Sequence, residues 1–590
     1  MDVDDDEYAG APPLLVVGEQ LQQQEEADDA AAALSLEDRF AGIVQELMRD
    51  EVDVAEALLA FKEVSTSQVE QLRDRASSLL HRSAHYLHAR QLAEDLESQG
   101  ATWELLLHLY ATGEQPAGMG GPPLPGAGGR QTYRQAVRGA VNGDASLERV
   151  AHVVAWLESL AAQRLAARPP LGFSAADGVW RETLLLSHAG GGGGGGGGGE
   201  LDPDAPSRGA TALRGEDQRN EERLAAQLWQ LMRAGKLQQA QDLCRRCGQD
   251  WRAAALSGGG PWGPLPVGAA AADADERMDD EWQAEDLAAE VEGGRGAGRA
   301  LWRWSCAAAA DAAASAAPAN RWEAALFGAL ASHVPRVLPV CGGWEDEAWA
   351  YCRAWLDLGA DEKAAEEAEA ARASFGDADS GAAHGAADAL AIPSDVLASL
   401  LDGAASSGYS RTVSAQLLQE GLSVASSEGG AAVAKLQRLR RDGDRSLVPA
   451  SFDDLRALLA ASPNPSVRAA AGQQQRALQL DLMAERWRDL VLELAGAAMA
   501  AYQQQQPRPD AAAAAAAEGG GALLRRAGDQ GFALLRFAAH LALALRALGL
   551  VRDPGLMELQ ARAHGVEGLD DEEEQEAARL QEVRGPPPWV

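Results

Sequence analysis

The stretch between residues 201 and 256 constrains the fold most, because its apolar residues repeat with a helical period. Four of them fall at i, i+4, i+7 and i+8, on one face of a helix: Leu224, Leu228, Leu231 and Met232. Gly235 and Gly248 follow two successive apolar runs, where glycine tolerates the left-handed conformation that ends a helix. Such short turns pack neighbouring helices antiparallel, and each pair needs further helices to cover its apolar faces. The stretch therefore predicts a stack of helices.

The same stretch predicts which side chains of its next two helices face the core. Seven small or apolar residues are expected on these faces: Leu237, Ala240, Cys244, Cys247, Trp251, Ala254 and Ala255. Glu221 lies toward the start of the first helix and Arg233 toward its end, where each charge suits the helix dipole.

Composition favours helices in the rest of the chain. Alanine is abundant, aromatic residues make up only 5% of the chain, and no segment shows the convincing alternation of a half-buried strand. No exact repeat of about 20–50 residues is visible, which argues against a regular repeat family. The sequence therefore predicts an all-α fold built as an irregular stack.

Changes in composition divide the chain into seven segments. They are a disordered acidic tail at 1–34, an N-terminal helical part of the solenoid at 35–188, a poly-glycine linker at 189–200, a central helical solenoid at 201–358 with a Gly/Ala/acidic insert near 258–298, weakly determined helical segments with low-complexity linkers at 359–530, a core helix at 531–550, and an acidic, proline-ended tail at 551–590.

Several helices have an expected position within these segments. The first follows a capping box at Ser35 and Asp38 and has Phe40, Ile43, Val44 and Leu47 facing inward. A second covers 67–98, with Val69, Leu72, Ala76, Leu79 and Leu80 facing inward. Further helices begin at Thr102 and at Ser146, and others occupy 393–401, 414–421, 452–461 and 476–501. A tryptophan-rich core segment spans 301–358. One of its helices places five residues on a single face: Trp344, Ala348, Tyr351, Cys352 and Trp355.

The most apolar segment, 531–550, is expected to be a buried helix and not a membrane span. Arg536, His540 and Arg546 interrupt it, and each would be costly at bilayer depth. The acidic N-terminus resembles neither a secretory signal nor a transit peptide. We therefore expect no transmembrane segment.

Charge and cysteine content exclude some classes of protein. The chain carries 52 basic and 88 acidic residues, a formal net charge of −36, and so acidic a surface repels phosphate backbones. Direct binding of nucleic acid is therefore not expected. Binding of basic partners, or simple solubility, are the two remaining explanations of the acidic charge. Five cysteines in 590 residues form no disulfide framework and fit a reducing compartment, the cytosol or nucleus.

The motifs that could carry chemistry all have a simpler structural interpretation. Cys244 and Cys247 form a C-x-x-C, but no second pair accompanies them, and burial on a helix face explains them better than zinc or redox chemistry. Three histidines share one helical face, which we expect to be solvated or half-buried: His81, His85 and His88. Glu345 and Asp346 are expected in a solvated first helical turn. We predict no enzyme and no catalytic, cofactor-binding or metal residues.

Several blocks of sequence resemble the nucleoporin 107 family, scaffold subunits of the Y-shaped complex of the nuclear pore. The blocks are TWELLLHLY at 102–110, VVAWLESLA at 153–161, GVWRETL at 178–184, LDPDAP at 201–206, RAGKLQQAQDLCRRCGQDWRAAAL at 233–256, LWRWSC at 301–306, RWEAALFGAL at 321–330 and LPVCGGWEDEAWAYCRAWLD at 338–357. Weaker matches lie at 480–490 and 534–550. The resemblance implies a folded-back α-helical solenoid similar to vesicle-coat proteins.

The resemblance also implies a role and partners. A scaffold nucleoporin would support mRNA export and protein import at the nuclear envelope, beside other Y-complex nucleoporins of the nucleoporin 96 and nucleoporin 133 types. After Leu550 the sequence shows no continuation of the family's C-terminal tail, which puts the nucleoporin 133 contact in doubt. Two other hypotheses remain open: a vesicle-coat-like helical adaptor of membrane traffic, and an enzyme that uses the C-x-x-C.

Overall fold

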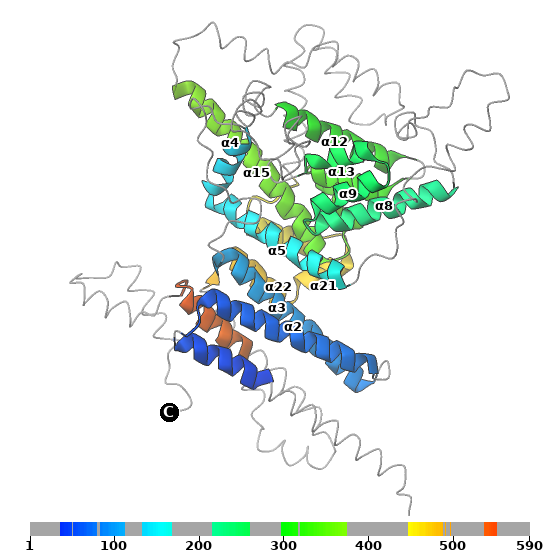
Figure 1. Cartoon of the computed structure of the whole chain (residues 1–590). Coiled ribbons are helices and arrows are strands. Elements are labelled where there is room, and N and C mark those ends of the chain that lie inside the picture. Colours follow the sequence, from blue (N-terminus) through cyan, green and yellow to red (C-terminus); the bar gives the residue numbers. More distant parts are fainter. Residues whose placement is uncertain are drawn as a thin grey trace, which may run out of the picture. The chain divides into compact units, whose positions relative to one another are not determined.

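The computed structural model describes residues 36–49, 51–78, 83–111, 133–167, 215–259, 297–316, 319–374, 447–487, 490, 496 and 536–551. Helices, joined by short turns, make up these parts of the chain, and no strand occurs in them, which confirms the all-α prediction (Figure 1). The chain divides into two compact units. Unit 1 combines Met1–Thr112 with Glu485–Val590, and unit 2 is Gly113–Ala484.

Unit 1 is built on a helical hairpin of α2 (Val54–Ser78) and α3 (Ala84–Leu106), which pack along each other. The single helix expected over 67–98 is therefore wrong. The hydroxyl of Ser83 accepts a hydrogen bond of 3.0 Å from the backbone N–H of Tyr86, which starts a new helix there. The expected inward residues Val69, Leu72 and Ala76 are nevertheless buried.

The expected helix start at Thr102 is also wrong, since Thr102 lies inside α3. Its hydroxyl donates to the carbonyl of Ser98, 2.9 Å away and one turn earlier, so it does not cap a helix. α3 continues to Leu106 and then widens into the π-helical turn η1 (Leu107–Ala111).

Two helices far apart in sequence complete unit 1, at 36–48 and 536–547 (blue and orange in Figure 1). Their aromatic side chains meet those of the hairpin: Phe61 stacks on Trp103 with ring centroids 4.9 Å apart, and Phe537 lies edge-on to Trp103 at 5.1 Å. Phe40 is 5.9 Å from Phe61. Helix 536–547 thus packs in a core, as expected, and none of the described helices is long and apolar enough to cross a bilayer.

Unit 2 contains the remaining described helices. In chain order they are α4 (Tyr133–Asn142), α5 (Ala145–Ala167), α8 (Gly215–Arg233), α9 (Leu237–Arg246), α10 (Asp250–Ser257), α12 (Ala297–Ser315), α13 (Arg321–Leu330), α14 (Val334–Val337), η4 (Leu338–Val340), α15 (Trp344–Ser374), α20 (Phe452–Ala460), α21 (Pro465–Ala471) and α22 (Gln474–Met483). The long helix α15 packs against α4, α5, α20 and α21 (Figure 1). It passes the expected segment boundary at 358 without a break.

Most of the periodicity in α8 and α9 is confirmed. All four apolar residues predicted for α8 are buried, as are Ala240, Cys244 and Cys247. Gly235 and Gly248 have φ of +67° and +74°, the left-handed conformation expected after each helix. The prediction of the third apolar face is wrong, because α10 buries Arg252, Ala253 and Leu256 and exposes Ala254.

The remaining helix predictions have mixed outcomes. The five-residue face of α15 is buried, α20 starts at the expected Phe452, and the buried Phe40 and Ile43 lie in helix 36–48. α5 begins at Ala145, where Asp144 accepts from the N–H of Ser146 at 2.9 Å. The helix expected over 476–501 is wrong: α22 ends at Met483, and Glu485 adopts a φ of +59°.

Several expectations lie outside the described residues. They are the tail at 1–34, the tail at 551–590 apart from Val551, the capping serine at 35, the poly-glycine linker at 189–200, the insert near 258–298 apart from its two ends, the helices at 393–401 and 414–421, and the inward residues Leu79 and Leu80.

Candidate functional site

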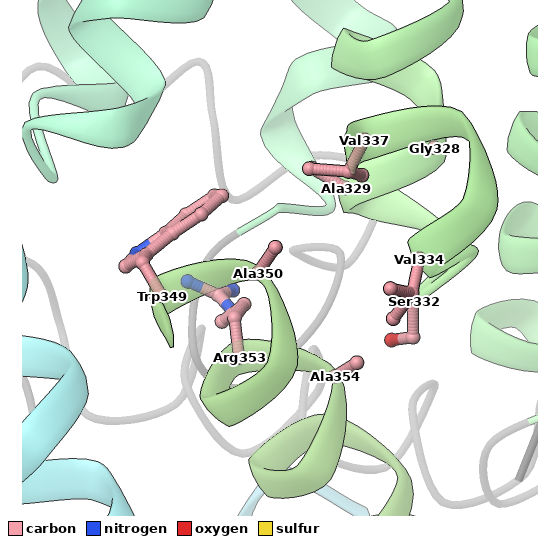
Figure 2. A pocket seen from close by; sticks show the side chains of 9 residues that line it. All are labelled: Gly328, Ala329, Ser332, Val334, Val337, Trp349, Ala350, Arg353 and Ala354. Carbon is pink, nitrogen blue, oxygen red and sulfur yellow. The ribbon is translucent and has the colours of Figure 1, made fainter. Parts of the chain in front are cut away.

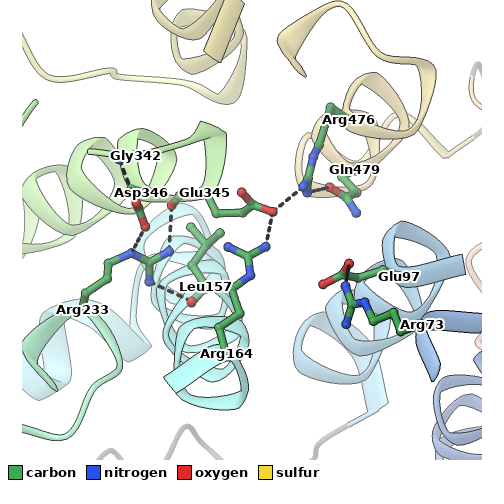
Figure 3. A network of polar contacts seen from close by, with 10 residues as sticks. All are labelled: Arg73, Glu97, Leu157, Arg164, Arg233, Gly342, Glu345, Asp346, Arg476 and Gln479. Carbon is green, nitrogen blue, oxygen red and sulfur yellow. Dashed lines mark hydrogen bonds and ion pairs between the residues drawn. The ribbon is translucent and has the colours of Figure 1, made fainter. Parts of the chain in front are cut away.

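Buried charged side chains at the junctions between helices are the most distinctive chemistry of unit 2. Arg233, at the end of α8, is only 4% exposed. Its guanidinium donates from Nε to Asp346 Oδ1 at 3.0 Å, from Nη1 to the carbonyl of Leu157 at 2.8 Å, and from Nη2 to the carbonyl of Glu345 at 2.9 Å (Figure 3). A residue expected only to suit a helix dipole therefore joins α8, α5 and α15.

Glu345 extends this junction to a further helix. Its carboxylate pairs with Arg164 of α5 at 2.7 Å and with Arg476 of α22 (Figure 3). Burial alone would raise the pKa of Glu345, but Arg476 and Arg164 outweigh it and lower the pKa to about 2. The prediction of a solvated first turn at Glu345 and Asp346 is therefore wrong: the turn is solvated only in part at Asp346 and buried at Glu345.

A second buried cluster surrounds Arg252, which is 1% exposed. Its Nη1 lies 2.5 Å from Glu221 Oε1 of α8, and its Nη2 lies 2.6 Å from Glu323 Oε1 of α13. Gln249 donates to the other oxygen of Glu221 at 2.8 Å. Burial lowers the pKa of Arg252, but the two carboxylates outweigh it and leave the pKa raised, so Arg252 stays charged and links α8, α10 and α13.

A third cluster lies along the middle of α15. Asp357 is within 3.1 Å of Arg353 and 3.7 Å of Arg303, which comes from α12. Glu158 of α5 accepts from the indole N–H of Trp349 at 3.0 Å and lies 3.6 Å from Arg353. Burial raises the pKa of Glu158, against the opposing charge of Arg353. This cluster ties α5 and α12 to α15.

A small recess lies between α13, α14 and α15, with Ser332, Trp349 and Arg353 among its lining residues (Figure 2). The recess has room for roughly one water molecule. Small-molecule sites typically enclose several hundred Å³. This recess is therefore suited to a bound water and not to a substrate.

The two cysteines singled out as possible metal or redox ligands occupy packing positions. Cys244 is 0% and Cys247 is 1% exposed, and burial raises the pKa of Cys244 to about 12, which suppresses thiolate chemistry. His85 and His88 are half-buried, and His81 lies outside the described residues. Within the described ranges, no three His, Cys, Asp or Glu side chains are grouped to hold a metal ion.

Sequence reasoning missed the buried charges, although one signal was available. Glu221 stands three residues before Leu224, so it belongs to the same apolar stripe that the periodicity assigned to the core. Arg252 offers a weaker signal, because its partner Glu323 is 71 residues away.

These junctions define the class: an α-helical protein whose buried chemistry fixes helices against one another. A comparison with known protein families identifies the family within this class. The model of the family described as nuclear pore protein 84 / 107 matches residues 93–563, and the chain belongs to that family.

Individual relatives match a shorter part of the chain. The chain is 33% identical over 270 residues to nuclear pore complex protein Nup107 of Mus musculus, a match that covers 44% of this chain and 27% of that protein. It is 32% identical over 151 residues to nucleoporin nup107 of Schizosaccharomyces pombe, covering 26% and 16%. The match to Nup107 of Drosophila melanogaster is 34% over 119 residues, covering 20% and 14%. The chain thus matches about a quarter of the mouse protein's length.

Proposed function

We propose that this chain is a structural, non-enzymatic subunit of the nuclear pore complex, located at the nuclear envelope within the Y-shaped scaffold. There it would support nucleocytoplasmic transport, including mRNA export and protein import. The family match over residues 93–563 carries the proposal, and the names of the curated relatives support it.

The proposed mechanism is burial of surface between helical stacks. A folded-back solenoid presents long helical faces, and stable interfaces of this sort bury upwards of about 2,000 Å². The clusters around Arg233, Arg252 and Asp357 support such a role, because each fixes three helices or more in one arrangement. A scaffold subunit needs that rigidity to transmit a defined geometry to its neighbours.

The proposed partners are other scaffold nucleoporins, in the first place of the nucleoporin 96 type. Because the family match continues past Leu550 to residue 563, the lack of a recognisable tail is no argument against a contact with the nucleoporin 133 type. Nucleic acid is not a proposed direct partner at a net charge of −36, and the envelope would be reached by association only. The vesicle-coat alternative is not favoured by the family match.

Affinity purification of the tagged chain from nuclear envelopes, followed by mass spectrometry, tests the proposal. We expect recovery of several scaffold nucleoporins. A matched control is Asp242→Asn, which removes half of an exposed ion pair with Arg245 and leaves the core intact. Recovery of Golgi or endosomal coat subunits in their place, with punctate staining and no nuclear rim, would reject the proposal.

A further inference from the structure

The segment 447–484 meets the rest of unit 2 through a defined set of contacts. Arg476 pairs with Glu345, and its guanidinium lies 4.7 Å from the centre of the Trp344 ring. Ser462 donates to Glu347 at 2.9 Å, with both residues 1% exposed. At the other end of the contact, Phe452 lies 5.1 Å from Trp355. The surface that receives the segment is therefore the first turns of α15 and the arginine of α5 that shares Glu345.

This set of contacts has the composition of an interface between separate molecules. It has an aromatic anchor, a half-buried arginine that pairs with a buried carboxylate and lies over a tryptophan ring, and a hydrogen bond between two buried groups. Aromatic residues and arginine are the residue types enriched in the cores of protein–protein interfaces. Asn464 adds a hydrogen bond of 3.4 Å to the carbonyl of Cys341, just before α15.

The segment also has internal order of its own. Ser451 caps α20 by accepting from Asp454 at 3.1 Å, and Asn464 caps α21 by accepting from Ser466 at 3.0 Å. Arg456 of α20 pairs with Asp481 of α22, so its first and last helices are joined directly.

We propose that the first turns of α15, together with Arg164 of α5, form a docking surface for the segment 447–484, which stays bound there without the peptide connection through 375–446. Glu345 and Glu347 select the segment by its arginine and serine, and Trp355 by its phenylalanine. The occupant fitted to this surface is thus a short helical segment with one half-buried cation. This inference concerns assembly of the chain itself and does not depend on the proposed role at the pore.

Cleavage of the folded full-length chain tests the proposal. Protease sites inserted after Gly430 and after Gly520 are both cut under native conditions, so that the segment is separated in sequence from α15 and from helix 536–547. Hydrogen exchange is then followed by mass spectrometry in peptides from α20, α21 and the first turns of α15. We expect exchange in these peptides to change less than about twofold on cutting, because the docking contacts remain. A loss of protection in the cut wild-type chain would overturn the proposal.

Arg476→Gln provides the second arm. It leaves Glu345 buried with Arg164 alone and removes the cation from Trp344, so the cut variant should lose protection by at least about tenfold. Circular dichroism of the uncut variant confirms that it folds, and Asp242→Asn serves as the control that should match wild type. Full protection in the cut Arg476→Gln chain would show that this junction does not hold the segment, and would contradict the assignment.

Discussion

At the scale of single residues, the buried charges of unit 2 differ from ordinary surface ion pairs. Arg252 lies 1% exposed between Glu221 and Glu323, whereas Arg245 and Asp242 form a pair in which both side chains are about half exposed. Exposed pairs contribute roughly 0–1 kcal/mol, since water screens them and two long side chains must be held still. A buried pair responds differently to the loss of one partner, because the other charge remains in a medium that solvates it poorly.

We therefore predict that Arg252→Gln lowers the free energy of unfolding by about 3–5 kcal/mol. The substitution strands two carboxylates in the core and removes a link between α8, α10 and α13. Thermal and urea unfolding, followed by circular dichroism, measure the change. The matched control Arg245→Gln should alter the same quantity by less than about 1 kcal/mol. Equal, small effects of the two substitutions would show that the Arg252 cluster contributes little to stability.

His540 makes the stability of unit 1 depend on pH. Its imidazole lies 5.4 Å from the ring of Phe61 and 5.6 Å from that of Phe40, and burial followed by the charge of Arg536 lowers its pKa from 6.5 to about 4. The folded state therefore favours neutral His540. The resulting stabilisation is fully present above pH 6.5 and is lost as the pH falls from 6.5 towards 4.

We predict that replacing His540 by phenylalanine removes this part of the pH dependence. As the pH is lowered from 6.5 to 4, the unfolding midpoint of unit 1 should decrease in the wild-type chain, and it should decrease less steeply in His540→Phe. Unfolding curves at half-unit pH steps, monitored by tryptophan fluorescence and by exchange in α2 and α3 peptides, give the comparison. Parallel pH profiles for the two proteins would contradict the assignment to His540.

At the scale of helices and turns, Gly235 is the position where the connection depends most on one residue. Its φ is +67°, and a Cβ built on it would lie 2.7 Å from Glu158 Oε2. Glu158 cannot easily move away, because Trp349 donates to it and Arg353 lies close to it. Both the backbone conformation and the space at this turn therefore favour glycine.

Gly235→Ala should destabilise unit 2 by about 1–3 kcal/mol. The control is Gly472→Ala, also at the end of a helix but with a φ of −82° and only ordinary contacts for a Cβ, so that it should be neutral or slightly stabilising. Urea unfolding of the two variants measures the difference. If Gly235→Ala unfolds at the same urea concentration as Gly472→Ala, the turn does not require glycine.

The helices themselves were largely predictable, and their junctions were not. Apolar period alone located α8, α9, α20 and the buried face of α15, because burial of one face is a local property of sequence. It failed between α2 and α3, where Ser83 caps a new helix although the apolar pattern continues. It also failed at Glu345, whose partners Arg164 and Arg476 are 181 and 131 residues away. No local sequence pattern can indicate a contact between residues so far apart in the chain.

At the scale of the whole molecule, the two units depend on different parts of the chain. In unit 1, Phe537 and His540 close the aromatic core that Phe40, Phe61 and Trp103 begin, although nearly 500 residues separate helix 36–48 from helix 536–547. Unit 2 draws all its described helices from residues 133–484. Loss of the C-terminal helix should therefore affect one unit and spare the other.

We predict that deletion of residues 531–590 raises hydrogen exchange in α2 and α3 while leaving α8, α9 and α13 protected. The deletion uncovers Phe40 and Trp103, each 1% exposed in the full chain, and removes the ion pair between Arg536 and Glu37. Hydrogen exchange with mass spectrometry resolves the two units in one sample. Unchanged protection of the α2–α3 hairpin would mean that it does not need the C-terminal helix.

We propose that this chain acts by binding other scaffold nucleoporins, through helical faces and without chemistry of its own. The decisive experiment mixes the purified chain with a purified scaffold protein of the nucleoporin 96 type and measures mass by light scattering during gel filtration. We expect a single species with the summed mass of the two proteins at micromolar concentration. Separate elution of two properly folded proteins, each at the mass of the free chain, would rule out this binding.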